Sequence, residues 1–234
     1  MQSVSNPLQA LTDVFYQPAA VFQSLAEKNN WSWLPFFIVV GFGCLPAYLY
    51  FGFIDITWYQ DMALASQADE LAPAQLDQMR EGMSRGILET SALVTGLLFP
   101  VIFTAVFAIY LHLMTKSDES QVYGFTDWYG FLWWTALPSV LNSLVALILI
   151  VTATNHQLEI TTLNPLSLAN AFSVSMTADW FGFLSYFRVD VVWGILLTGI
   201  GINQWTSFSK AKSFTLATAP HIVILTIWLL FLVM

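Results

Sequence analysis

Apolar residues gather in five long runs separated by polar stretches, and this pattern predicts membrane-spanning helices. The runs cover about 34–53, 87–114, 131–151, 189–205 and 214–234. A bilayer core of about 30 Å requires about 20 apolar residues in a helix, and each run approaches that length. We therefore predict an all-α, polytopic integral membrane protein with a five-transmembrane-helix bundle. Prolines in or near the runs predict kinked helices that pack against one another.

The N-terminal region, residues 1–33, contains two predicted helix starts. Asn6-Pro7 combines a capping amide with a residue whose missing N–H costs nothing at the first helical position. Pro18 opens a second segment with apolar residues at helical spacing. We expect two short interfacial amphipathic helices here, preceding a five-span domain at 34–234. They either lie along the membrane surface or pack against the bundle.

The polar segment 54–86 is the most acidic part of the chain. Its carboxylates include Asp69, Glu70, Asp77 and Glu81. Apolar residues at helical spacing after Pro73 predict a helix that continues into the second span, with Glu81 and Arg85 as an i,i+4 ion pair. The carboxylates lack the spacing of an EF-hand, so a solvated acidic face is favoured over a calcium site.

Composition supports lipid as the main solvent. Of 234 residues, 57% are hydrophobic and 9% charged, whereas a soluble domain has about a quarter charged residues. Ten Trp residues suit helix ends at membrane interfaces. A net charge of −8 argues against nucleic acid as a partner. Because Cys44 is the single cysteine, one chain can form neither a disulfide framework nor a multi-cysteine metal site.

Charge differs between the two predicted sides of the membrane. The side with the N-terminus has four basic and five acidic residues, whereas the opposite side has three basic and ten acidic residues. Cytoplasmic loops carry an excess of basic residues, so the larger number on the side of the N-terminus favours a cytoplasmic N-terminus. Five spans then place the C-terminus on the opposite side.

Three polar side chains within the predicted spans are candidates for a functional role. They are His221, His112 and Asn142. Ionisable residues at membrane depth are functional candidates by default, because burying them is costly unless they are paired. Each histidine is either a proton relay or ligand-binding group, or a neutral side chain hydrogen-bonded to a neighbouring helix.

Small and polar residues recur at helical spacing in the third and fourth spans. They are Ala136, Ser139, Ser143 and Ala146 in the third, and Gly194, Thr198 and Gly201 in the fourth. Small residues let helices in lipid approach closely. We expect both faces to be packing surfaces, within the bundle or between protomers.

Signatures of enzymes are missing from the chain. It has no Gly-x-Ser-x-Gly elbow, no His-Glu-x-x-His and no phosphate-binding glycine-rich loop. Gly41-x-Gly43 lies inside the first apolar run and indicates close helix packing. We therefore expect a non-enzymatic protein without a cofactor or a metal.

Several short motifs occur along the chain in a recognisable order. They are Asn6-Pro7, Phe15, Pro18, Phe22, Trp33-Leu34-Pro35, Ala136-Leu137-Pro138-Ser139, Asp190, Trp193, Leu196-Leu197, Gly199-Ile200-Gly201 and Ser209-Lys210-Ala211-Lys212-Ser213. In these motifs the chain resembles the Yip (Ypt/Rab-interacting protein) membrane family, in its bacterial branch. The resemblance implies a five-span helical protein with a cytoplasmic N-terminus. Eukaryotic relatives act in vesicle traffic with small GTPases, but the long N-terminal region and Asp-Leu-Tyr-Gly-Pro motif of those relatives are absent here. Small-GTPase binding is therefore not carried over.

Two functions remain open from the sequence. The first is membrane organisation, or a scaffold for other membrane proteins, through helix packing and lipid contact. Its partners would be membrane lipids and either a second copy of the chain or another membrane protein, and its expected location is a bacterial inner membrane. The second is a transporter of a small molecule, lipid or ion that uses the intramembrane polar residues.

Overall fold

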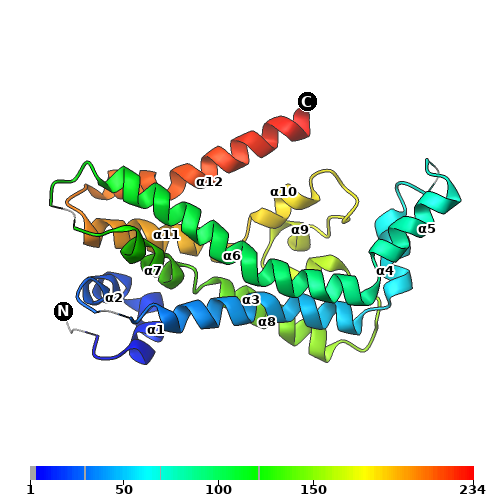
Figure 1. Cartoon of the computed structure of the whole chain (residues 1–234), viewed down its shortest axis with the longest axis horizontal. Helices are drawn as coiled ribbons and strands as arrows, with labels where there is room; N and C mark the ends of the chain where they lie inside the picture. The colour runs from blue at the N-terminus through cyan, green and yellow to red at the C-terminus, as the bar shows by residue number, and fades with distance from the viewer. Residues whose placement is uncertain (1–3, 29, 69, 121) are drawn as a thin grey trace. The chain divides into compact units, whose positions relative to one another are not determined.

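The computed structural model describes residues 4–28, 30–68, 70–120 and 122–234, and the regular elements in these ranges are all helices (Figure 1). The chain divides into two compact units. Unit 1 comprises Met1–Val40, Phe99–Val140 and Asp190–Met234; unit 2 comprises Gly41–Leu98 and Leu141–Val189. Asp69, one of the predicted acidic-loop residues, lies outside the described ranges.

Three described helices are long and apolar enough to cross a membrane alone. They are α3 (Trp33–Phe53), α6 (Arg85–Thr115) and α12 (Lys210–Val233). A fourth span results if α7 (Phe125–Thr135) and α8 (Ser139–Thr152), which are bent by 42° relative to each other, cross together. The bounds of α3, α6 and α12 agree with three predicted runs to within a few residues. The described helices thus provide three to four candidate spans.

The run at 131–151, predicted as one span with a proline kink, is divided between α7 and α8, and the helix is broken at residues 136–138. Pro138 has no N–H to donate to the carbonyl of Trp134, so the regular ladder stops there. Tighter turns replace it: Leu137 N–H donates to Trp134 O at 3.4 Å, and Ser139 N–H donates to Ala136 O at 3.0 Å.

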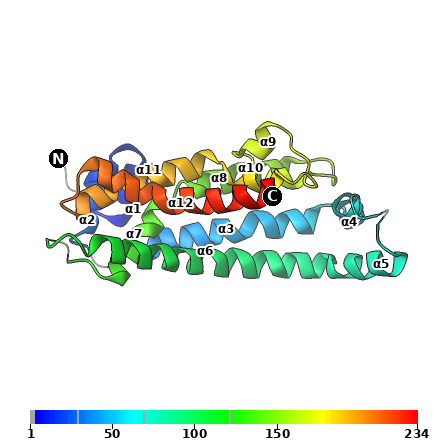
Figure 2. The ribbon, with the colours of Figure 1, turned by 90° about the horizontal axis from the view of Figure 1, so that it is seen from above.

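Helix α11 (Val189–Trp205) reproduces the fourth predicted run but is short for a membrane span. Its 17 residues extend about 26 Å, somewhat less than a bilayer core of about 30 Å. The predicted count of five spans depends on α11 and stays a prediction. In both views α11 lies beside the first half of α12 (Figure 2), where the Gly199 backbone meets the Phe214 ring.

The N-terminal helices α1 (Pro7–Tyr16) and α2 (Pro18–Leu25) form as predicted. Asn6 Oδ1 accepts a hydrogen bond from Gln9 N–H at 2.9 Å, which caps α1. Helix α2 buries Val21 and Phe22 completely. Two placements were predicted, along the membrane surface or packed against the bundle, and α2 has the packed one.

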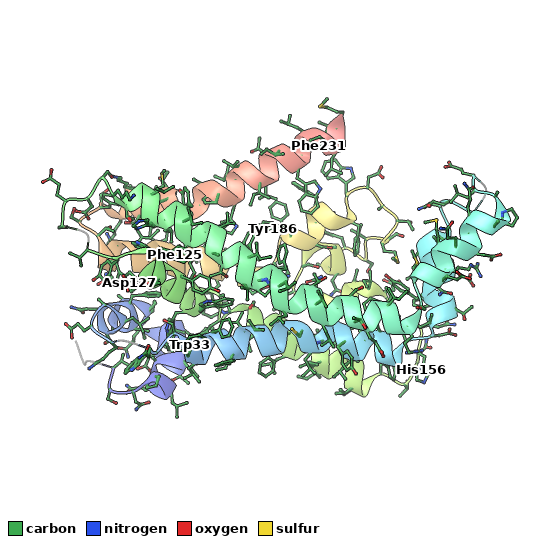
Figure 3. All side chains as sticks on the ribbon, in the orientation of Figure 1. Trp33, Phe125, Asp127, His156, Tyr186 and Phe231 are labelled. Carbon is green, nitrogen blue, oxygen red and sulfur yellow. The ribbon has the colours of Figure 1, made fainter. Side chains whose placement is uncertain are left out.

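Aromatic side chains make the core of unit 1. Phe131 packs against Phe22 and Trp205 with ring centroids 5.0 Å apart in each pair, and Trp128 lies 5.2 Å from Trp205. The Trp205 indole N–H donates to Phe22 O at 2.8 Å. The large rings of α7 face inward, and the expected place of these Trp residues at the membrane interfaces stays a prediction. Trp33 is 60% exposed at the start of α3 (Figure 3) and fits the expectation better.

Unit 2 contains α4 (Ile56–Leu64), α5 (Pro73–Gly82), the short helix η1 (Ile160–Leu163), α9 (Leu168–Ala171) and α10 (Phe181–Tyr186). Buried Tyr50 connects α3 to the segment after α8, because its hydroxyl donates to Leu158 O at 2.7 Å. Nearby, His156 Nδ1 lies 2.6 Å from Phe53 O at the end of α3 (Figure 3).

Helices α3 and α6 meet closely at Gly96. A methyl group on Gly96 would lie 2.9 Å from the Cys44 Cα atom, so the two backbones are almost in contact. The predicted close packing at Gly41-x-Gly43 holds for Gly43, because a methyl group on Gly43 would lie 3.9 Å from Gly96 O. A methyl group on Gly41 would meet no atom within 4 Å, because Gly41 is on the exposed side of α3.

The predicted pair of Glu81 and Arg85 is also wrong. Helix α5 ends at Gly82, and α6 starts anew at Arg85. The Arg85 guanidinium donates to the carbonyls of Phe51, Gly52 and Ile54 at the C-terminal end of α3. Helix carbonyls without intrahelical partners attract a cation, and this attraction outweighs a pair on an exposed surface.

Candidate functional site

The amide of Asn142 joins α8 to the irregular chain that follows it. Asn142 Nδ2 donates to Leu163 O at 3.2 Å, and Asn142 Oδ1 accepts from Leu166 N–H at 3.3 Å. The side chain is buried, and it satisfies two backbone groups outside regular helices. Asn142 precedes Thr152, the end of α8, by roughly ten residues, which is about 15 Å along a helix. Its position on a membrane-depth helix is thus explained by backbone support.

The same irregular segment is held to the start of α11. Arg188 Nη1 donates to Asn164 Oδ1 at 2.9 Å, and Ser167 forms an isolated antiparallel bridge with Arg188. Leu168 N–H donates to Phe187 O at 3.0 Å. Backbone groups outside regular helices need other hydrogen-bond partners when they are buried, and protein groups supply them here. Sequence reasoning missed these contacts, since nothing in the hydrophobic pattern pairs Asn164 with Arg188.

The two candidate histidines lie in different surroundings. His221 packs edge-on against the Phe107 ring, with centroids 5.3 Å apart. His112 Nδ1 is buried and has no hydrogen-bond partner among the described residues. His112 is next to the buried face of α6, which includes Thr104 and Ala108. The functional roles of His221, His112 and Asn142 stay predictions.

Small residues of α11 lie close to neighbouring helices in unit 1. A methyl group on Gly201 would lie 2.5 Å from Phe131 Cζ and 3.1 Å from Phe22 Cγ. A methyl group on Gly194 would lie 3.0 Å from Thr135 O, and Thr198 Oγ1 donates back to Gly194 O at 2.8 Å. These positions form contacts between helices of one chain.

The small residues predicted for the third span are divided by the break. Ala136 follows the last residue of α7, and Ser139 Oγ, at the start of α8, donates to Ala136 O at 2.8 Å. Ala146 is fully buried on α8, whereas Ser143 is half-buried. A single continuous packing face over these four residues is therefore not formed, because Pro138 interrupts the helix.

A buried carboxylate ties two loops of unit 1 together. Asp118 is 7% exposed and accepts hydrogen bonds from Ser120 Oγ at 2.7 Å and from Ser207 N–H at 2.6 Å. Ser207 Oγ also donates to it, at 2.9 Å. The Ser120 hydroxyl, followed by the Ser207 backbone, lowers the pKa of Asp118 from 3.8 to about 2. The carboxylate stabilises the turn between α11 and α12.

Long apolar surfaces on α6 and α12 remain uncovered by the described chain. In each helix, 6% of the most apolar 18-residue stretch is buried. Exposed side chains include Ile102 and Val106 on α6 and Ile227 on α12. Phe231, near the end of α12, is also exposed (Figure 3). Such surfaces are stable only against lipid or other apolar helices. No group of three or more His, Cys, Asp or Glu side chains that could hold a metal occurs in the described part of the chain.

These features define a helical integral membrane protein whose spans contact lipid. The Yip1 domain family matches residues 12–232, and the chain belongs to that family. The family resemblance predicted from short motifs is confirmed, and the bacterial branch stays a prediction. No curated protein and no solved structure matches the chain.

Proposed function

We propose that this Yip1 domain protein is a non-enzymatic membrane scaffold that organises the membrane, or partners other membrane proteins, through helix packing and lipid contact. The observation that carries the proposal is the extent of uncovered apolar surface on α6 and α12. Helix association in lipid depends on side-chain packing rather than on water exclusion. Two long helices with free apolar faces are suited to such packing, with a second copy or another membrane protein.

The buried and exposed residues of α6 distinguish its inward face from its outward face. Helix α6 buries Thr104, Ala108, Leu111 and Thr115 on one stripe. Its exposed residues, such as Ile102, lie off that stripe. The inward stripe holds the chain together, so the outward face is available for association.

Crosslinking in native membranes tests the proposal. After replacement of Cys44 with Ala, single cysteines are placed at Ile102 and Ile227, which are 60% and 51% exposed. Matched controls have the cysteine at Ala108 and Ala217, which are 0% and 3% exposed on the same two helices. We expect a short bifunctional maleimide to link the exposed positions to a second copy or a stable partner and to leave the controls monomeric.

The alternative of a transporter uses His221 and Asn142. The Asn142 amide is already engaged at both ends by backbone groups, which leaves little of it for a passing solute. In liposomes with an entrapped pH-sensitive dye, the scaffold proposal predicts equal proton flux for the wild-type chain and His221→Ala. Flux that the wild-type chain supports and His221→Ala loses, with its fold retained, would overturn the scaffold proposal. Uniformly monomeric crosslinking products would also count against it.

We further propose that the N-terminus is cytoplasmic in a bacterial inner membrane, with the C-terminus on the opposite side. Contacts within each unit are compatible with this topology: Asp118 meets Ser207, and Asp55 N–H donates to His156 O at 2.8 Å. Each pair joins loops assigned to one side of the membrane. Reporter fusions after Thr115 and at Met234 distinguish five spans from four. If α11 is a span, the two reporters lie on opposite sides of the membrane. If it is not, both lie on the same side.

A further inference from the structure

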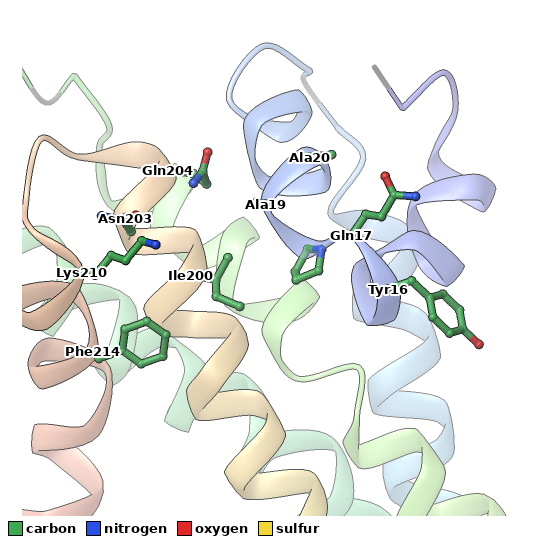
Figure 4. Close-up of a pocket in the computed structure, with 10 residues that line it drawn as sticks. Tyr16, Gln17, Ala19, Ala20, Ile200, Asn203, Gln204, Lys210 and Phe214 are labelled. Carbon is green, nitrogen blue, oxygen red and sulfur yellow. The ribbon is translucent and has the colours of Figure 1, made fainter. Parts of the chain in front are cut away.

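A groove in unit 1 lies between the α1–α2 junction and the facing parts of α11 and α12 (Figure 4). Its volume is about 530 Å³, within the range of about 300–1,000 Å³ that is common for small-ligand sites. Ile200 and Phe214 contribute apolar side chains to the wall. The groove therefore offers an apolar surface wide enough for part of a lipid.

Polar groups line the same groove. Gln17 belongs to the α1–α2 junction, Asn203 and Gln204 to α11, and Lys210 to the first turn of α12. The lining residues include one cation, Lys210, and no carboxylate. Amide and ammonium N–H groups beside apolar walls suit an amphipathic anion.

Lys210 differs from its near neighbour Lys212. The Lys212 ammonium lies 3.3 Å from the centroid of the Phe208 ring and donates to Ser117 Oγ at 3.4 Å. Lys210 has no ion pair with a described residue, and its side chain extends into the groove (Figure 4). Its charge is therefore available to a ligand.

We propose that this groove binds the headgroup of an anionic phospholipid, with the phosphate at Lys210 and the glycerol and first methylenes against Ile200 and Phe214. An anionic headgroup is favoured over a zwitterionic one because the lining residues include one cation and no carboxylate. The position supports it, because the candidate span α12 begins at Lys210 and the ends of membrane spans lie at the depth of the headgroups. This proposal names one lipid that the proposed scaffold would contact. It rests on the proposed function, because it requires that the chain lies in a bilayer.

The test uses the full chain in zwitterionic detergent micelles, with phosphatidylglycerol added against a phosphatidylcholine background. Native mass spectrometry measures the apparent dissociation constant of bound lipid. We expect Lys210→Gln to weaken phosphatidylglycerol binding about five-fold, since one base near an anionic surface contributes about 1 kcal/mol. Lys212→Gln removes the same charge two residues away and should leave binding unchanged. Ile200→Trp fills the groove without a charge change and should also weaken it.

Four results would overturn the proposal. Equal effects of Lys210→Gln and Lys212→Gln would indicate a general surface charge, and no effect of either would remove the site. Competition by soluble glycerol phosphate would indicate a free phosphate as ligand. Altered self-association of Lys210→Gln with unchanged lipid binding would indicate a protein occupant. Lipid binding is measured on monomers in micelles, so it does not require assembly of the protein. A negative result for lipid binding is therefore distinct from a negative result of the crosslinking test.

Discussion

Substitution of Gly201 by Ala tests the packing of unit 1 most directly. Gly201 lies on α11 against Phe131 and Phe22, both of which are buried in the aromatic core. Its role is spatial, since no glycine in the described ranges has a positive φ. An added methyl group would lie 2.5 Å from Phe131 Cζ, whereas carbon atoms pack favourably at about 3.5–4.0 Å. Phe131 Cε2 would lie closer still to the added methyl group, so the ring would have to move by more than about 1 Å.

The structure leaves the Phe131 ring little freedom to move. It is 1% exposed and touches Phe22, Trp128 and Trp205. Overpacking of a filled core costs about 1–3 kcal/mol. Replacing a helical glycine by alanine returns up to about 1 kcal/mol of helix propensity. We expect Gly201→Ala to lower the free energy of unfolding by about 1–2 kcal/mol, or the Tm by about 2–8 °C for a chain of this size.

Thermal unfolding in detergent, followed by Trp fluorescence, measures this difference. Gly41→Ala is the matched control, because a methyl group on Gly41 would meet no atom within 4 Å. It should be neutral or slightly stabilising. Phe131→Leu combined with Gly201→Ala should cost less than the sum of the two single changes. Equal Tm values for Gly201→Ala and Gly41→Ala would refute the packing argument.

Three further predictions concern polar groups. Asn142→Leu should lower the free energy of unfolding by about 1–2 kcal/mol, because two hydrogen bonds of about 0.6 kcal/mol each are lost. Denaturant titration measures this loss, and Asn142→Gln, which keeps the amide, is the control. Arg85→Gln should cost about 1 kcal/mol and increase hydrogen exchange at the end of α3, a result that unchanged exchange would contradict. Because the pKa of Asp118 is lowered from 3.8 to about 2, the unfolded chain binds more protons than the native chain in this window. Stability from Asp118 should be complete above about pH 4 and disappear as the pH falls toward 2. Asp118→Asn should lack this dependence in pH-resolved unfolding, and an unchanged profile would exclude the assigned role.

The class of fold and most helix limits follow from the sequence, because long apolar runs and caps are local signals. Asn6-Pro7 predicted the start of α1, and the fourth run predicted α11 at its observed bounds. The break at Pro138 was harder to place. A membrane helix accommodates proline as either a kink or an interruption, and neighbouring helices decide between them.

Side-chain partners could not be predicted, because they join residues far apart in the chain. Arg85 has an acidic neighbour one turn before it, yet it binds the carbonyls of α3. The amide of Asn142 was predicted only as a candidate, and its backbone partners lie 21 and 24 residues away. The buried tryptophans of α7 fit the composition of an interface equally well. These contacts depend on packing, for which a single sequence holds no periodic signal.

The contact between Gly96 and Cys44 gives the chain a built-in reporter. The only thiol of the protein lies where α3 and α6 are closest, with its Sγ 3.0 Å from the position a methyl on Gly96 would occupy. An alkylating reagent therefore competes with helix contact for access to this sulfur. The rate of Cys44 modification becomes a measure of how often the two helices separate, in the native sequence and without an attached probe.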